Sequence, residues 1–253
     1  MFRNGIKKWL RLPRRSGLRP PWDGYEANSP YEGLVTITDP GSVAAEAYRT
    51  LRANLLYAFA DHPPKVIVLT SPGSREGKST ACANLGVGLA QVENNVLILD
   101  CDLRSPAQHE VFGLRNLYGI VDVLAGEREL QEVWQGPLPG LKMIAAGPIP
   151  LNPAELLSSS RFAELIGQVR ERFDFVLIDS PPVGPTSDAA ILSTRADGVL
   201  FVLDAQITPE WTVRRSLRSL HTVGANVLGT VMNNVDHTNY PYFGQTYYAG
   251  TGD

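Results

Sequence analysis

The sequence contains no long apolar run. A membrane-spanning helix needs about 18 or more consecutive apolar residues, and no stretch of the 253-residue sequence provides them. The first residues, MFRNGIKKWLRLPRR, also lack the apolar middle of a secretory signal. We therefore expect a cytoplasmic protein.

Cysteine and histidine are scarce, which narrows the possible chemistry. The two cysteines, Cys82 and Cys101, fall in segments with helix and strand patterns, without metal-ligand spacing or the framework of a disulfide-rich domain. The four histidines are scattered along the chain, so their spacing argues against a zinc site. We expect reduced thiols and no zinc.

Positive charge is sparse in most of the chain and concentrated at its start. Seven basic residues precede the first acidic residue, Asp23, and the remaining 16 basic residues face 26 acidic ones, a balance of −10. An acidic body repels nucleic-acid phosphates, so no nucleic-acid partner is expected. The arm either attracts an anionic membrane surface or is a solvated terminus. Its charges are Arg3, Lys7, Lys8, Arg11, Arg14, Arg15 and Arg19.

Short apolar runs alternate with helical stretches from about residue 40 onward. Continuously apolar strands are covered on both faces, so the alternation predicts an α/β fold with a doubly wound, mainly parallel sheet and helices on both faces. Residues 44–59 have the apolar spacing of an amphipathic helix. The predicted strands are Val66–Thr70, Val96–Asp100, Leu141–Ala145, Phe175–Asp179, Val199–Asp204 and Val227–Met232. We divide the chain into a basic arm (1–39), one α/β domain (40–236) and a tyrosine-rich tail (237–253).

A phosphate-binding loop is predicted between the first strand and the next helix. A tight loop at a helix N-terminus directs N–H groups and the positive end of the helix dipole at phosphate oxygens. Lys78 adds a mobile cation, and the Ser79 hydroxyl can ligate Mg²⁺. The loop is a variant one, because Pro72 stands six residues before Lys78. Its candidate nucleotide-binding residues are Gly73, Ser74, Arg75, Glu76, Gly77, Lys78, Ser79 and Thr80.

Three aspartates stand at the ends of two predicted strands. Asp100 and Asp102 follow VLIL, and Asp179 follows FVLI. Carboxylates at strand carboxyl ends project into the crevice where a doubly wound fold binds its ligand. There they can hold Mg²⁺, directly or through water, and can accept a proton from an attacking hydroxyl. We therefore expect ATP and Mg²⁺ as cofactors, with Lys78, Asp100, Asp102 and Asp179 as catalytic residues.

These residues resemble the motifs of the bacterial tyrosine kinases, a P-loop NTPase family of the deviant Walker A type. That family has a phosphate loop ending in GKS or GKT, an Asp-x-Asp-x-Arg motif after one strand and an Asp-x-Pro-Pro motif after another. The resemblance covers roughly residues 40–236. The matching segments are Gly77-Lys78-Ser79, Asp100-Cys101-Asp102-Leu103-Arg104, Asp179-Ser180-Pro181-Pro182 and NPAELL at 152–157.

The resemblance implies a role for each matched residue. Lys78 would bind the β- and γ-phosphates, and Asp100 would accept the tyrosyl proton. The metal residues would be Ser79, Asp102 and Asp179, with Asp179 acting through the metal's water shell.

Three further positions have less definite roles. Asn233, at the end of the last predicted strand, would face the adenine, whereas Arg104 either serves the motif or simply neutralises its aspartates. Arg75 departs from the family, which generally has glycine there. An L-residue forced into a left-handed conformation costs roughly 1 kcal/mol or more, so Arg75 either strains the loop or contributes charge to the nucleotide.

The helix near residue 50 contains a Glu-x-x-Arg-x-x-Arg pattern formed by Glu46, Arg49 and Arg52. Spacing of three permits an internal ion pair worth a few tenths of a kcal/mol, about 0.3. In the resembled family the same pattern is the subunit contact of ring oligomers. We therefore expect a homo-oligomer that uses these three residues.

The tail from Asp236 to Asp253 contains no Ile, Leu, Val or Met, which predicts a mobile segment without a core. It is either a sticky aromatic end or a cluster of phosphorylation sites. Thirteen residues at about 3.3 Å each span roughly 40 Å, enough to enter a neighbouring active site. The candidate phosphorylation sites are Tyr240, Tyr242, Tyr247 and Tyr248.

The resemblance implies an ATP-dependent tyrosine kinase that phosphorylates its own tail between subunits and regulates capsular and exopolysaccharide synthesis and export. A separate membrane-embedded chain-length protein would activate it and hold it at the inner face of the cell membrane, and a tyrosine phosphatase would reset it.

Two alternatives stay open. One is a partitioning ATPase of the ParA/MinD type that hydrolyses ATP to water, although those proteins usually have a lysine early in the loop, where this chain has Gly73, Ser74 and Arg75. The other is a nucleotide-binding adaptor without catalysis. Lys78→Met is expected to abolish phosphotyrosine formation and to leave the fold intact, because the lysine contacts ligand rather than core.

Overall fold

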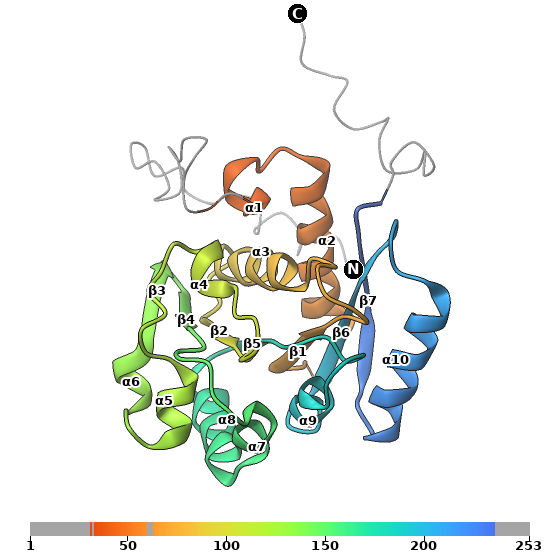
Figure 1. Cartoon of the computed structure of the whole chain (residues 1–253). Helices are drawn as coiled ribbons and strands as arrows, with labels where there is room; N and C mark the ends of the chain where they lie inside the picture. Colours follow the sequence, from red (N-terminus) through yellow and green to blue (C-terminus); the bar gives the residue numbers. More distant parts are fainter. Residues whose placement is uncertain (1–30, 32, 60–62, 236–253) are drawn as a thin grey trace, which may run out of the picture.

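A seven-stranded sheet forms the centre of the computed structural model, which describes residues 31, 33–59 and 63–235 (Figure 1). The strand order is β3-β4-β2-β5-β1-β6-β7, and every described pairing is parallel except that of β3 with β4. The predicted doubly wound, mainly parallel sheet is therefore confirmed. The strands are β1 (Val66–Thr70), β2 (Val96–Asp100), β3 (Trp134–Leu138), β4 (Leu141–Ile144), β5 (Phe175–Asp179), β6 (Gly198–Asp204) and β7 (Val227–Asn233).

Helices cover both faces of the sheet (Figure 1). One face carries α1 (Val35–Thr38), α2 (Val43–Tyr57), α3 (Lys78–Ala90) and α4 (Gln108–Val111). The other carries α5 (Ile120–Ala125), α6 (Leu130–Val133), α7 (Pro153–Ser158), α8 (Ser160–Arg172), α9 (Asp188–Ser193) and α10 (Glu210–Thr222). Within the described ranges, no helix is long and apolar enough to cross a membrane.

The central strands are apolar throughout because both of their faces are covered. In β1, Val66 and Val68 pack with the α5–α10 layer, whereas Ile67 and Leu69 pack with the α1–α4 layer. All four side chains are fully buried. Alternation between two apolar environments leaves no polar position among these four residues, which explains the continuous apolar run of residues 66–69.

Residues 34–38 belong to the packed structure, although the sequence analysis assigned them to the arm. Leu34 is fully buried and Ile37 is 5% exposed. The N–H and hydroxyl of Thr36 both donate to Asn84 Oδ1 in α3, at 3.1 and 3.0 Å. Packing therefore begins before residue 40, and the division into arm, domain and tail stays a prediction.

The structure contains one strand that the sequence did not predict. β3 is an edge strand with the sequence WQGPL, whose glycine and proline are unusual in strands, and its pairing with β4 is irregular. Residues 44–59 form a helix as expected, with α2 running from Val43 to Tyr57. Its N-cap is Ser42, whose hydroxyl accepts from the Ala45 N–H at 3.1 Å.

Parallel strands bring the motif residues to one edge of the sheet. Asp100 and Asp179 are register partners in β2 and β5, and β5 also pairs with β1, which leads into the predicted loop. Helix α3 crosses close to β2 because Gly86 has no side chain: a Cβ there would lie 2.7 Å from Ile98 Cδ1. This close approach places the start of α3 beside the aspartates.

Candidate active site

The loop from Ser71 to Gly77 connects β1 to α3, and side chains of the loop hydrogen-bond to its own backbone. The Ser71 hydroxyl donates to the Gly73 carbonyl at 2.6 Å, and the Gly73 N–H donates to Glu76 Oε1 at 2.7 Å. Gly77 caps α3 at φ 85°, and Lys78 begins the helix. The local structure is the predicted one, a tight turn at the N-terminus of a helix, which is a ready site for phosphate.

Arg75 has the left-handed conformation that the loop requires, with φ 64° and an exposed side chain. The chain therefore keeps the turn without the glycine that the family generally has. The left-handed backbone costs an L-residue about 1 kcal/mol.

Asn233 lies against the loop at the end of β7. A Cβ on Gly77 would lie 1.8 Å from Asn233 Nδ2, so glycine is required at this contact. The same Nδ2 donates to the Glu76 carbonyl at 3.3 Å. The structure thus gives Asn233 a contact with the phosphate loop, and its adenine role stays a prediction.

Lys78 brings together the carboxylates predicted from the sequence. Its Nζ donates to Asp102 Oδ2 at 2.8 Å and to Ser79 Oγ at 3.2 Å, and it lies 3.6 Å from Asp179 Oδ1. Asp102 is 3% exposed, and Asp100 and Asp179 are fully buried. Two carboxylates, those of Asp102 and Asp179, therefore share one ammonium group beside the buried Asp100.

This charge distribution shifts two pKa values. Burial alone lowers the pKa of Lys78, but the charges of Asp179 and Asp102 outweigh it, so the pKa of Lys78 lies above its ordinary value. Burial raises the pKa of Asp100 well above its ordinary value, and the negative charge of Asp179 raises it further. The lysine stays charged at neutral pH, and the raised pKa makes the Asp100 carboxyl a better proton acceptor than an ordinary aspartate.

Asp100 also anchors the segment that follows β2. Its Oδ1 accepts from the Asp102 N–H at 3.3 Å, and its Oδ2 accepts from the N–H groups of Ala107 and Gln108 at 3.1 and 2.9 Å. Asp100 thus organises the Asp-x-Asp-x-Arg segment in addition to its predicted role as a base.

Gln108 is a site residue that the sequence analysis missed. Its Nε2 donates to Asp179 Oδ2 at 2.8 Å and to the Ser79 carbonyl at 3.0 Å. Glutamine has no strong motif signal of its own. The available signal is its position, eight residues after Asp100 on the segment that leaves the same strand.

Arg104 pairs with Asp188 at the start of α9. Its Nε donates to Asp188 Oδ2 at 2.7 Å and its second guanidinium nitrogen to Oδ1 at 3.2 Å. Asp188 is fully buried. Arg104 therefore joins the segment after β2 to α9, and the bonds that hold it lead to Asp188 rather than to the two motif aspartates.

The opposite flank of the loop is a closed hydrogen-bond network. Glu76 is 4% exposed, and its Oε2 accepts from the Thr208 hydroxyl at 2.7 Å and from the Asp204 N–H at 3.3 Å. Asp204 Oδ2 in turn accepts from Asn234 Nδ2 at 2.6 Å. The side chain of Glu76 connects the loop to the end of β6, and the predicted contact of this loop residue with nucleotide stays a prediction.

Each charged residue of the predicted α2 motif has a partner within the chain. Arg49 pairs with Glu46 and also donates to the Pro40 carbonyl. Arg52 donates to the Gly88 carbonyl at 2.8 Å, one of the last-turn carbonyls of α3 that no intrahelical N–H can reach. Arg52 therefore caps α3, the helix whose other end holds the phosphate loop.

The residues present fit a cation that arrives with a nucleotide. Asp179 Oδ1 is buried and receives no hydrogen bond from any described residue. Within the described ranges, no three His, Cys, Asp or Glu side chains converge as a complete metal cage. Mg²⁺ commonly binds through one or two carboxylates and substrate phosphates, so Ser79, Asp102 and Asp179 could hold it once phosphates complete its shell.

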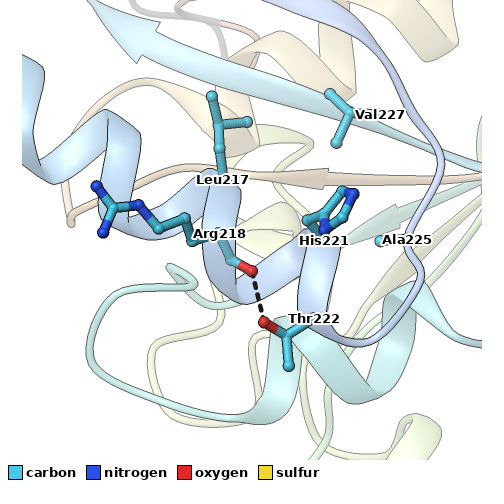
Figure 2. Close-up of a pocket in the computed structure, with 6 residues that line it drawn as sticks. All are labelled: Leu217, Arg218, His221, Thr222, Ala225 and Val227. Atoms are coloured by element: carbon cyan, nitrogen blue, oxygen red, sulfur yellow. Dashed lines mark hydrogen bonds between the residues drawn. The ribbon is translucent and has the colours of Figure 1, made fainter.

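Other predicted features lie elsewhere. The basic arm up to residue 30 and the four tail tyrosines lie outside the described residues. A hollow of about 550 Å³ lies between α10 and the start of β7 (Figure 2). That place is at the amino end of a parallel strand, opposite the phosphate loop.

Cys82 and Cys101 are free, and burial raises the pKa of both thiols.

Known proteins share this arrangement. The family described as the "CobQ/CobB/MinD/ParA nucleotide binding domain" matches residues 67–246. The "Tyrosine-protein kinase YwqD" of Bacillus subtilis is 37% identical over 83% of this chain and 91% of its own length. The "Tyrosine-protein kinase wzc" of Salmonella typhi is 35% identical over 87% of this chain, which spans only 31% of that protein. The solved "kinase domain of Escherichia coli tyrosine kinase ETK" is 30% identical with a TM-score of 0.77, over 80% of each chain.

The sheet, the loop between β1 and α3, and the family match define a P-loop nucleotide-binding domain of the CobQ/CobB/MinD/ParA class. Within that class, the site carries an Asp-x-Asp-x-Arg segment against the phosphate-loop lysine. The chain belongs to the bacterial tyrosine kinases.

Proposed function

We propose that this kinase transfers the γ-phosphoryl group of Mg·ATP to tyrosines in the C-terminal tail of a neighbouring copy. The observation that carries the proposal is the contact of Lys78 with Asp102 and Asp179, beside the buried Asp100. Lys78, the cation that would contact the phosphates, and Asp100, the carboxyl with the raised pKa, lie at the same edge of the sheet. This is the equipment for phosphoryl transfer to a hydroxyl.

In the proposed reaction the tyrosyl oxygen forms a bond to the γ-phosphorus, and the bond from that phosphorus to the β,γ-bridging oxygen breaks, so ADP leaves. Asp100 accepts the tyrosyl proton, and Lys78 exchanges carboxylate partners for phosphate oxygens. Loop N–H groups and the dipole of α3 hold the phosphates. Mg²⁺, held by Ser79, Asp102 and Asp179, supplies neutralisation of phosphate charge.

Mixing two variants tests transfer between copies. The recipient carries Asp100→Asn with an intact tail, and the donor is active but has phenylalanine at Tyr240, Tyr242, Tyr247 and Tyr248. We expect phosphate on the recipient tail, mapped by mass spectrometry. Labelling of wild type but never of the recipient would exclude the intersubunit route. Asp100→Asn suits the recipient because it removes a buried charge, whereas Lys78→Met would leave Asp102 and Asp179 without their cation.

We propose that Glu46 and Arg49 contribute to a ring-shaped homo-oligomer. The test leaves Arg52 unmutated, because its side chain caps α3 and its loss would also affect that helix. Glu46→Ala with Arg49→Ala should lower the mass found by analytical ultracentrifugation. The control removes Glu210 and Arg214, an exposed pair on α10. Equal masses for both double variants and the wild type would leave the α2 charges as a local ion pair.

Phosphorylation would also reverse assembly. Each phosphotyrosine adds about −1.5 to −2 charges, so four of them place about −6 to −8 on the tail of an acidic chain. Such a tail should bind poorly beside ATP phosphates, and the ring should dissociate. We expect size-exclusion chromatography to show a smaller species after ATP and the larger one again after a tyrosine phosphatase. An unchanged peak would contradict the release step.

The proposed setting is capsular and exopolysaccharide synthesis and export, at the inner face of the cell membrane. A separate membrane-embedded activator would hold the kinase there, with the basic arm adding attraction to anionic lipids. A strain carrying Asp100→Asn should produce polysaccharide of altered amount or length. Unaltered polysaccharide in that strain would remove this setting and leave the enzymatic proposal intact.

A further inference from the structure

Gln108 connects the three segments of the candidate active site. Its side chain is fully buried, and its Nε2 bonds to Asp179 Oδ2 and to the Ser79 carbonyl. Its backbone N–H bonds to Asp100 Oδ2. Both partners of Nε2 are acceptors, so only the NH₂ end of the amide can face them, and chemistry fixes the orientation of the side chain.

This orientation leaves two buried oxygens without a donor among the described residues, Asp179 Oδ1 and Gln108 Oε1. Buried polar atoms are nearly always hydrogen-bonded, and exceptions in a site point to a ligand or water that completes them. Because Gln108 holds Oδ2 of Asp179, the oxygen that stays available is Oδ1, 3.6 Å from Lys78 Nζ.

We propose that Gln108 is a positioning residue that acts through Asp179. It fixes the carboxylate so that Oδ1 faces the water shell of the nucleotide's Mg²⁺, and its own Oε1 accepts a hydrogen bond from a water of that shell. Partners that orient metal-binding groups in this way typically contribute a factor of about 10 to 100 in metal affinity. The inference rests on the nucleotide and Mg²⁺ part of the proposed function and is independent of tyrosine transfer.

The test measures Mg²⁺ dependence of nucleotide binding by the full chain. A fluorescent ADP analogue is titrated with Mg²⁺ and, separately, bound in EDTA. Gln108→Met keeps the length of the side chain and removes both donated bonds. We expect the Mg²⁺ concentration for half-maximal binding to rise about 10-fold or more, with unchanged affinity in EDTA.

Asn84→Leu is the matched control. Asn84 is also a fully buried amide, but it bonds to Thr36, Gly33 and Thr80 and to none of the aspartates. It should lower the melting temperature and leave the Mg²⁺ midpoint where it is in the wild type. Gln108→Asn, whose amide is one methylene shorter, should give a midpoint between the wild type and Gln108→Met, and it serves where the Met variant folds poorly.

A second measurement separates positioning from general support. In an Asp179→Asn background, Gln108→Met should raise the midpoint by less than it does in the wild type, because the route through Asp179 is already altered and only the Oε1 contact is left to lose. A full additional rise there, an equal loss of affinity with and without Mg²⁺, or wild-type midpoints in both Gln108 variants would overturn the inference. A shifted midpoint in a chain that forms no phosphotyrosine would instead refute the proposed transfer and keep Gln108 in its role.

Discussion

The two flanks of the phosphate loop differ in how their carboxylates are hydrogen-bonded. On the flank of Glu76 and Asp204, each carboxylate oxygen accepts at least one hydrogen bond from the chain itself. On the flank of Lys78, the carboxylates of Asp102 and Asp179 share one ammonium beside the buried Asp100, and Asp179 Oδ1 has no donor among the described residues. The first flank is complete without ligand, whereas the second is completed by it. Substitutions on the first should therefore change stability, and those on the second should change nucleotide chemistry.

Lys78→Met should have the largest effect. It removes the phosphate-binding cation, for which we expect a loss of phosphotyrosine formation of about 10³-fold. The intact fold of this variant stays a prediction, but a cost in stability is expected: Lys78 is 9% exposed and paired with Asp102, so its removal leaves buried carboxylates unpaired. The free energy of unfolding should fall by about 3 kcal/mol at neutral pH, measured by urea titration. Wild-type stability of the variant would show that water already screens these carboxylates.

The lost stability should return in acid. Asp100 has a folded-state pKa above its unfolded value, so its contribution to stability is present below the unfolded pKa and is lost as pH rises through the folded pKa. Loss of Lys78 raises that folded pKa further. The difference in the free energy of unfolding between variant and wild type should therefore shrink as pH falls from neutral, through the folded-state pKa of Asp100, toward its unfolded value. A difference that grows over this range would contradict the charge argument.

Asp100→Asn and Asp179→Asn should separate the two roles on the metal flank. Asp100→Asn should bind Mg·ADP better than Asp179→Asn and still lose phosphoryl transfer by about 10² to 10⁴-fold, the usual contribution of a general base. Calorimetric titration and phosphotyrosine blotting measure the two effects. Full activity in Asp100→Asn would leave this residue as the anchor of the segment after β2.

Thr208→Val should act on the closed flank through stability alone. It removes the hydroxyl that bonds to Glu76, at an expected cost of about 1 kcal/mol in the free energy of unfolding. Thr222→Val is the control, because Thr222 ends α10 and its hydroxyl donates to the exposed Arg218 carbonyl, away from Glu76. A selective loss of Mg·ADP binding in Thr208→Val would show that this flank also serves the ligand.

Arg75→Gly should have the smallest effect. Glycine relieves the left-handed strain but adds freedom to the unfolded chain, so the net gain in stability should stay below about 1 kcal/mol. Arg75→Ala removes the charge and keeps the strain. If both variants weaken ADP binding equally, the guanidinium contributes to the nucleotide; if neither does, Arg75 is only a tolerated replacement for glycine.

The sequence predicted the parts of the fold that follow from period and burial. Runs such as Val66–Thr70 are apolar because two helical layers cover them, and that environment is visible in composition alone. β3 was missed because an edge strand containing Gly136 and Pro137 carries little strand signal. The packing of residues 34–38 was missed because four helical residues are too few to show a period.

The same division applies to the site. Lys78, Asp100, Asp102 and Asp179 were predictable, since charged residues at strand ends stand out against apolar runs. The bonds of Gln108 and the network of Glu76 were not, because each depends on side chains brought together from distant segments. Sequence patterns therefore identify the residues that contact a ligand. They identify less readily the residues that hold those ligand-contacting side chains in place.

The ion pair between Arg104 and Asp188 has a consequence for how this sequence can evolve. The two residues lie 84 positions apart, and the buried carboxylate of Asp188 depends on the guanidinium for compensation. Replacing Arg104 alone leaves the buried Asp188 charge uncompensated, which typically costs about 3 to 5 kcal/mol. Replacing Asp188 alone leaves only a half-exposed guanidinium that water can solvate. Relatives that lack the arginine should therefore also lack the aspartate, whereas loss of the aspartate alone should be tolerated more often.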